Sequence, residues 1–475
     1  MDKIKERGEV YTPTVVVTQM LNMIGYTFRE NIQDKHIIDN SCGDGRFLTQ
    51  IVKRYIQQCK DFLSKEQLAN NLSTYIHGIE LDKESYNKCV SNLNEIVKKH
   101  NIPEVKWDIL NENALNVTCY DGKMDFVVGN PPYVRVHNIK GEYYDNLRNF
   151  SFTEKGNSDL YLAFYELGLR MRNSTGHLAY ITPSAWCTNA SGKNFRKFIK
   201  ESRQLQTVYD YQSSKVFGDA ATYVMICHFT PNPNIAVLYS TEPLSSHLLS
   251  YDEIFVDDKL FFCKPQDIKL LKDCHDVKQK KCVVKNGYAT LCDKVFIDNV
   301  QDYLNDCVIP VIKSSTGEKK MCIYPYDENG KIFQLQYLEE NYNYTYLYLM
   351  MNEGKLRARD YDTKYTDKGQ WWGFGRKQAI NDTYKRKIAI NSLIRDENDL
   401  KIVEAKEGTG VYGGLYILTD ENIGTITSIL KTREFSDYVK LFRHYKSGGY
   451  FAFTAKEVEK YLNYCLSGNN SLSLK

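Results

Sequence analysis

The chain has 475 residues, 42% of them hydrophobic and 13% aromatic, and its formal net charge is +3. This length allows a substantial core and two or three domains. The small charge excludes nucleic-acid binding through the overall field of the protein, so such binding would need local basic patches. The 13 cysteines include no Cys-x-x-Cys pair. This argues against a zinc site and a disulfide framework, so we expect reduced thiols and no bound metal.

No segment has the character of a targeting or membrane-spanning sequence. The amino terminus, MDKIKERGEV, lacks an apolar stretch, and no run of about 18 apolar residues occurs later. We therefore expect a soluble cytoplasmic protein with no membrane partner.

The first predicted element is a helix that begins near residue 13. Thr12 is typical of an N-cap and Pro13 of the first helical position, and apolar residues then recur on one helical face. The residues from Tyr11 to Pro13 are either a plain helix start or a loop that closes over a ligand.

A strand, a glycine turn and a helix follow, which together form the first βα unit of a doubly wound sheet. The strand covers residues 36–39 and ends in Asp39, the turn carries Gly43 and Gly45, and the helix continues from Phe47. Glycines at these positions let a ligand approach the backbone closely. The turn is neither the Gly-x-Gly-x-x-Gly dinucleotide fingerprint nor a phosphate-binding P-loop.

Two further strands are predicted to end in carboxylates. Segment 75–80 is predicted to be a strand that ends in Glu80, and segment 105–108 a strand that ends in Asp108. A carboxylate at the tip of the second strand of a doubly wound fold is well placed to bind both hydroxyls of a ribose. Asp108 can accept a hydrogen bond from an adenine amine.

The fourth predicted strand, residues 126–128, leads to the tetrapeptide Asn130-Pro131-Pro132-Tyr133. Two prolines cannot continue a β-ladder, so the chain leaves the sheet as a stiff loop at the carboxyl end of the strand, where open α/β sheets bind ligands. The Asn130 side-chain carbonyl and the Pro131 backbone carbonyl can each accept a hydrogen bond from one NH2 group. Tyr133 can stack on a base taken out of a duplex. The alternative is an ordinary strand and turn.

Three acidic strand tips followed by this loop resemble the gamma class of S-adenosylmethionine-dependent DNA amino-methyltransferases. In that class the cofactor segment precedes the Asn-Pro-Pro-Tyr segment, and a target-recognition domain comes last. The match is close over the first half of the chain and loose over the second. Asn40-Ser41 stand where the family more often has Pro-Ala. The resemblance implies a Rossmann-like α/β sheet and methyl transfer to the N6 amine of a flipped adenine.

The resemblance also implies roles for particular residues. The flipped base would stack between Tyr133 and Phe217, and catalysis would fall to Asn130, Pro131, Pro132 and Tyr133. The implied S-adenosylmethionine site comprises Tyr11, Thr12, Pro13, Asp39, Cys42, Gly43, Gly45, Phe47, Glu80, Leu81, Asp108 and Asn130.

From about residue 240 the pattern changes to short β-like runs, with tyrosines clustered around 342–348. We therefore predict a methyltransferase domain over residues 1–240 and a mixed α+β DNA target-recognition domain over residues 241–475. Basic and aromatic residues interleave in the second domain, as phosphate and base-edge contacts require. A single arginine is more often a solvated surface residue. The predicted DNA contacts are Arg357, Arg359, Arg376, Lys377, Lys385, Arg386, Arg443 and Lys446.

The predicted function is site-specific methylation of double-stranded DNA in a restriction-modification or epigenetic system, by a monomer that associates with the nucleoid when bound to DNA. The alternatives are transfer to cytosine N4, to an RNA guanine or to a protein glutamine, and a non-catalytic DNA-binding partner subunit. Cytosine-N4 enzymes more often have serine at the position of Asn130. Because the Thr-Pro motif already occurs at Thr12, we expect any restriction endonuclease to be a separate chain.

Overall fold

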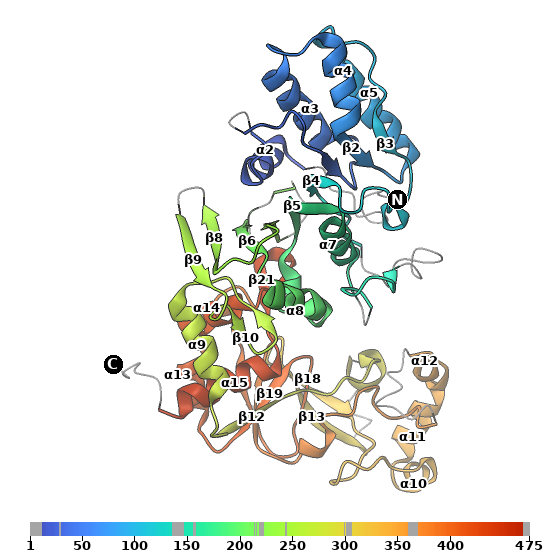
Figure 1. Cartoon of the computed structure of the whole chain (residues 1–475). Coiled ribbons are helices and arrows are strands. Elements are labelled where there is room, and N and C mark those ends of the chain that lie inside the picture. The colour runs from blue at the N-terminus through green and yellow to red at the C-terminus, as the bar shows by residue number, and fades with distance from the viewer. Residues whose placement is uncertain are drawn as a thin grey trace. The chain divides into compact units, whose positions relative to one another are not determined.

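The computed structural model describes residues 12–27, 30–134, 147–154, 158–212, 214, 216–217, 223–242, 245–298, 300, 306–359 and 369–468. The chain divides into two compact units, Met1–Ile268 and Lys269–Lys475 (Figure 1). The domain boundary expected near residue 240 therefore falls inside unit 1. The reason is that strands β8 (Ala236–Glu242) and β9 (Ser245–Ser250) continue the unit 1 sheet.

Unit 1 is built on one sheet with the strand order β3-β2-β1-β4-β5-β7-β6-β8-β9. The neighbours from β3 to β5 are parallel, whereas β7 is antiparallel to both β5 and β6. The sheet is the doubly wound, mostly parallel α/β sheet that the sequence predicts. The bounds are β1 (Ile37–Asp39), β2 (Ile76–Ile79), β3 (Asp108–Leu110), β4 (Met124–Gly129), β5 (Arg172–Pro183), β6 (Leu205–Asp210) and β7 (Val224–Phe229), and a separate pair is formed by β10 (Phe255–Val256) and β11 (Lys259–Leu260).

Helices cover both faces of this sheet. Successive residues of a strand point to opposite faces, so each strand packs against the helices on both sides. Ile37 packs into one buried apolar cluster, with side chains of α2 to α5, whereas its neighbour Ile38 packs into the other, with side chains of α7 and α8. Burial on both faces explains why the strands are short continuous apolar runs. The bounds are α2 (Thr14–Met23), α3 (Arg46–Cys59), α4 (Lys65–Tyr75), α5 (Lys83–Lys99), α7 (Leu160–Met171) and α8 (Lys193–Ser202).

Unit 2 combines small sheets with helices. Its strand orders are β12-β19-β15-β17, β14-β13-β18 and β16-β21-β20. The strands are β12 (Cys282–Asn286), β13 (Val308–Lys313), β14 (Glu318–Ile323), β15 (Lys387–Ile390), β16 (Leu393–Ile394), β17 (Ile402–Ala405), β18 (Gly410–Tyr412), β19 (Leu415–Thr419), β20 (Tyr445–Lys446) and β21 (Tyr450–Ala452). The helices are α9 (Pro265–Asp276), which spans the boundary, and α10 (Leu335–Asn341), α11 (Asn343–Met351), α12 (Glu353–Arg357), α13 (Ile423–Leu430), α14 (Arg433–Leu441) and α15 (Ala455–Leu466). Within the described residues no helix is both long and apolar enough to cross a membrane.

The tyrosine cluster around 342–348 is helical rather than β-like. Tyr344 and Thr345 lie in the first turn of α11, and their backbone N–H groups donate to the carboxylate of Asp306 at 2.9 and 3.3 Å. This carboxylate satisfies N–H groups that a helix start leaves without an intrahelical partner. The alternating tyrosines misled the prediction because the residue that caps the helix is distant in sequence.

Candidate cofactor and catalytic site

The loops after β1, β2 and β4 meet at the carboxyl edge of the unit 1 sheet. Strand β1 pairs in parallel with β2 on one side and with β4 on the other. The strand order reverses between β1 and β4, and such a switch point is where open α/β sheets bind ligands. Asp39, Glu80 and Asn130 each end or directly follow one of these strands, so the fold brings the three together at this edge.

The turn after β1 has the backbone shape that its glycines permit. Gly43 and Gly45 adopt φ angles of 54° and 86°, which only glycine adopts readily. A Cβ on Gly45 would lie 2.6 Å from the Cys89 Sγ on α5. Cys42 and Phe47 are buried in the core. Their side chains therefore belong to the apolar core that supports the turn.

Glu80 closes this turn from the neighbouring strand. Its Oε2 accepts a hydrogen bond from Gly43 N at 2.8 Å, and its Oε1 accepts one from Asp82 N at 2.7 Å. Each carboxylate oxygen has a second lone pair that can accept from a ribose hydroxyl. Leu81 is 54% exposed beside it. A fixed carboxylate and an exposed apolar side chain suit the sugar and the base of a nucleoside.

Two more features of this edge fit a bound nucleoside cofactor. Ser41 has a buried hydroxyl with no hydrogen-bond partner in the described parts of the chain. Gly129 approaches β1 so closely that a Cβ would lie 2.7 Å from Asp39 Oδ1. The edge thus contains a buried hydroxyl, that of Ser41, to which a ligand could bind. It also contains a close approach of the Gly129 backbone to Asp39 that only glycine allows.

Asn130 is held by the segment before α2. Its Nδ2 donates to Thr12 Oγ1 at 3.1 Å. The prediction that Thr12 caps α2 is wrong, because Pro13 occupies the N-cap position and no side chain caps the helix. Thr12 instead joins the segment before α2 to the loop after β4. Tyr11 lies outside the described residues.

Tyr133 and Phe217 are brought together as predicted partners. Their ring centroids are 6.3 Å apart, with an interplanar angle of 60°. The Tyr133 hydroxyl donates to the Ile181 carbonyl at 3.1 Å, and Tyr161 contacts the Tyr133 ring edge-to-face at 6.3 Å. Pro131 is buried and Pro132 is half-buried. The Tyr133 side chain is therefore held by a hydrogen bond at its hydroxyl and by contacts with two aromatic rings.

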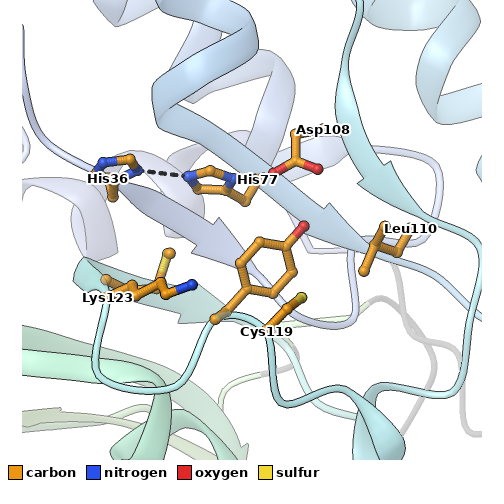
Figure 2. A pocket seen from close by; sticks show the side chains of 8 residues that line it. His36, His77, Asp108, Leu110, Cys119 and Lys123 are labelled. Carbon is orange, nitrogen blue, oxygen red and sulfur yellow. Dashed lines mark hydrogen bonds and ion pairs between the residues drawn. The ribbon is translucent and has the colours of Figure 1, made fainter.

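Asp108 lies elsewhere. Strand β3 begins at Asp108, which pairs with His77 of β2, and the strand ends at Leu110. Its carboxylate accepts a hydrogen bond from His77 Nδ1 at 2.6 Å, and His77 Nε2 lies 2.9 Å from His36 Nδ1. These groups line a cavity of about 510 Å³ at the amino end of the strands (Figure 2). The prediction that Asp108 ends the third strand is wrong, and the residue is not assigned to the cofactor.

The carboxyl end of β3 carries Asn111, Glu112 and Asn113 instead. Asn111 Nδ2 donates to the Glu80 and Leu81 carbonyls at 2.8 and 3.0 Å, which ties the loops after β2 and β3 together. The signal that would have found this segment is the polar run directly after the apolar pair that ends β3.

The predicted DNA contacts of unit 2 differ in burial and in partners. Arg376 and Lys446 are exposed. Arg357 pairs with Glu353, Lys377 with Gln370, Lys385 with Asp382, and Arg386 with Glu404. The Arg357 and Arg386 pairs are exposed on both sides, and surface ion pairs of this kind contribute about 0–1 kcal/mol.

Arg359 and Arg443 are the exceptions. They are only 8% and 7% exposed. The Arg359 guanidinium donates to the carbonyls of Thr290, Trp371 and Gly373. Burial removes both arginines from the set of DNA contacts. In sequence they resembled their exposed neighbours, since the carbonyls that surround Arg359 come from distant segments.

The burial of Asp39 predicts a pH-dependent stability. Its side chain is 1% exposed, and burial raises its pKa from 3.8 to about 8, although the Ser41 N–H opposes the rise. The folded state keeps this proton where the unfolded state loses it. The contribution of Asp39 to the free energy of unfolding is therefore largest below about pH 4, declines as the pH rises and levels off above about pH 8.

Asp39→Asn is therefore expected to flatten the profile of unfolding free energy between about pH 5 and pH 8. The measurement is urea denaturation at several pH values, with the exposed Asp61→Asn as the matched control. A slope that is unchanged in Asp39→Asn contradicts the buried, protonated state.

Known proteins resemble this chain in sequence. Residues 46–217 match the family described as Eco57I restriction-modification methylase. The Type II methyltransferase M.BstVI of Geobacillus stearothermophilus is 26% identical over 387 residues, which cover 69% of this chain and 68% of that protein. M.PaeR7I of Pseudomonas aeruginosa, also a Type II methyltransferase, is 25% identical over 229 residues, which cover 47% of this chain and only 40% of that protein.

Among solved structures, the Type IIL restriction-modification enzyme MmeI in complex with DNA has a similar fold. Its TM-score is 0.67 at 12% sequence identity, and the alignment covers 97% of this chain and 69% of MmeI. At this identity the likeness concerns the fold alone. The family match over residues 46–217, the methyltransferase relatives and the fold support a gamma-class DNA methyltransferase of the restriction-modification type, whose cofactor is S-adenosylmethionine.

Proposed function

We propose that the protein methylates the N6 amine of adenine within a specific sequence of double-stranded DNA. The observation that carries this proposal is Asn130, held by Thr12 at the carboxyl end of β4 and followed by Pro131, Pro132 and Tyr133. An amide oxygen and a backbone carbonyl in this order can hold a planar exocyclic amine. Serine is the residue that favours cytosine N4 at this position.

The cofactor, when bound, supplies a methyl group already activated on a cationic sulfur, so the chain supplies orientation and electrostatics. Because the Asn130 Nδ2 donates to Thr12, its Oδ1 is the atom of the amide that would accept a hydrogen bond from the amine. The Pro131 carbonyl is the second acceptor. Together they align the lone pair of the amine with the methyl group, and the amine gives up a proton as the new bond forms. No strong general base is required.

The cofactor is held, in this proposal, by the Gly43 to Gly45 backbone and by Glu80. Asn111 and its neighbours replace Asp108 as the segment that faces the adenine end, because they follow β3 at the carboxyl edge and are tied to the Glu80 loop. Thr12 and Pro13 close the site from the side of α2.

A base in a duplex cannot reach this loop, so we propose that the target adenine is flipped and stacks on Tyr133 and Phe217. Replacing either ring with alanine is expected to weaken base capture by about 1–3 kcal/mol. Tyr133→Phe is the matched control, since it removes only the hydrogen bond to Ile181. The measurement is the fluorescence of 2-aminopurine at the target position. Equal signals from Tyr133→Ala and Tyr133→Phe would contradict the stacking role.

Unit 2 is proposed to read the target sequence, with Arg376 and Lys446 as its exposed cations and Arg357, Lys377, Lys385 and Arg386 as further phosphate contacts. We also propose a cytoplasmic monomer that associates with the nucleoid on DNA, with any restriction endonuclease on a separate chain.

The test is transfer of labelled methyl from S-adenosylmethionine to unmethylated bacterial DNA, with ribosomal RNA and total protein as parallel substrates. We expect label in DNA alone. Label confined to RNA or protein would keep the catalytic unit and overturn the role of unit 2. Cofactor binding without label in any substrate would indicate a non-catalytic partner subunit.

A further inference from the structure

Asp39 is an unusual neighbour for a cationic ligand because it lies inside the protein rather than on its surface. It ends β1 at the switch point, its side chain is 1% exposed, and its Oδ1 accepts a hydrogen bond from Ser41 N at 3.1 Å. The backbone of Gly129, one residue before Asn130, lies directly against the same oxygen. The carboxyl therefore lies beneath the loops that form both halves of the site.

No positive charge compensates this carboxyl in the described part of the chain. The titratable groups that act on it or feel it are Glu80 after β2, the Cys42 thiol in the turn and the Tyr180 phenol on β5. None of these is a cation, and Glu80 is a second carboxylate at the same edge. Burial without a cation favours the neutral form of a carboxyl group, and its pKa is raised to about 8.

We propose that Asp39 couples cofactor binding to proton release, so that the site distinguishes the cationic cofactor from the neutral thioether product. The carboxyl is protonated in the free protein. It ionises when the sulfonium of S-adenosylmethionine supplies the missing positive charge, and it takes a proton again once that charge has gone. This inference rests on the proposed methyl-transfer function for its product step, but its binding step requires only the cofactor.

The charges balance through the reaction. Transfer breaks the sulfonium C–S bond, the electron pair stays on sulfur, and the methyl group bonds to the acceptor nitrogen. The nitrogen loses one proton to solvent water, and the sulfur becomes neutral in S-adenosylhomocysteine. Asp39 then no longer faces the sulfonium charge and is protonated again, which weakens the binding of the product relative to that of the cofactor at neutral pH and above.

The test is isothermal titration calorimetry of the whole protein with S-adenosylmethionine and, separately, with S-adenosylhomocysteine. Each titration is run near pH 7 in phosphate and in Tris, whose ionisation enthalpies differ, so that the heat reports the protons released. The two ligands share the nucleoside, amino and carboxylate groups and differ in the sulfonium charge. We expect net proton release with the cofactor and little or none with the product, because only the cofactor carries the sulfonium charge.

The affinity for the cofactor is also expected to rise about tenfold per pH unit below pH 8, relative to the affinity for the product. Asp39→Asn should remove both the proton release and this relative slope. Equal proton release for the two ligands, or none for either, would overturn the proposal even if Asp39→Asn fails to fold. Binding of neither ligand at any pH would instead overturn the cofactor assignment itself.

Discussion

Asn130→Ala is expected to lower the rate of methyl transfer by about 10³-fold or more, while the cofactor Kd changes by less than about threefold. The substitution removes the side-chain carbonyl that orients the amine and leaves the fold of the turn after β1 untouched. The Asn130 side chain meets Thr12, whereas Glu80 holds the cofactor turn, so the two functions are separable. Single-turnover rates with saturating DNA measure the first quantity, and calorimetry measures the second.

Thr12→Val provides the matched control. It keeps Asn130 and removes the hydroxyl that accepts its amide N–H at 3.1 Å. The Asn130 amide then loses its fixed orientation but keeps its oxygen and nitrogen. We therefore expect the rate of methyl transfer to fall by about tenfold, an intermediate effect. Turnover close to wild type in Asn130→Ala would contradict the role given to this loop.

Arg359→Ala is expected to lower the unfolding free energy of unit 2 by about 3–5 kcal/mol. The guanidinium is 8% exposed and donates to carbonyls that belong to well-separated segments, at Thr290, Trp371 and Gly373. Removing it leaves several buried carbonyls without donors at once. Urea denaturation, followed by a probe in unit 2, measures the change.

Arg357→Ala is the control for this substitution. Arg357 lies two residues away, its side chain is 53% exposed, and it pairs with Glu353 and stacks over Trp371 at 5.3 Å. Its loss is expected to cost about 0–1 kcal/mol and to weaken DNA binding modestly. If Arg359→Ala were as stable as wild type but failed to bind DNA, the sequence-based assignment of Arg359 to DNA would be restored.

Three strand ends of unit 1 could be predicted from the sequence, because a polar or charged residue interrupts each apolar run. Asp39 ends β1, Glu80 directly follows β2, and Asn130 directly follows β4. The prediction failed at β3, where the boundary was set by pairing with β2 rather than by the local sequence. The strand begins at Asp108 instead of ending there, which puts Asp108 at the opposite edge of the sheet, next to His77. The register of a short strand is set by its pairing with the neighbouring strand and cannot be inferred from its own few residues.

Unit 2 was predicted less well, because its key contacts join segments that are distant in sequence. Arg359 is held by carbonyls before and after it, and α11 is capped by Asp306. Neither partner follows a local pattern. Burial, which the residue types do not show, decided which of the predicted arginines lie at the surface.

The most direct test of the central claim is to identify the modified base. Genomic DNA lacking methylation is treated with the protein and S-adenosylmethionine, and the product is read by single-molecule sequencing and by mass spectrometry of its nucleosides. Asn130 followed by Pro131 and Pro132 predicts N6-methyladenine within one short sequence motif. N4-methylcytosine would contradict the role assigned to Asn130. N6-methyladenine without a shared sequence motif would contradict the role assigned to unit 2.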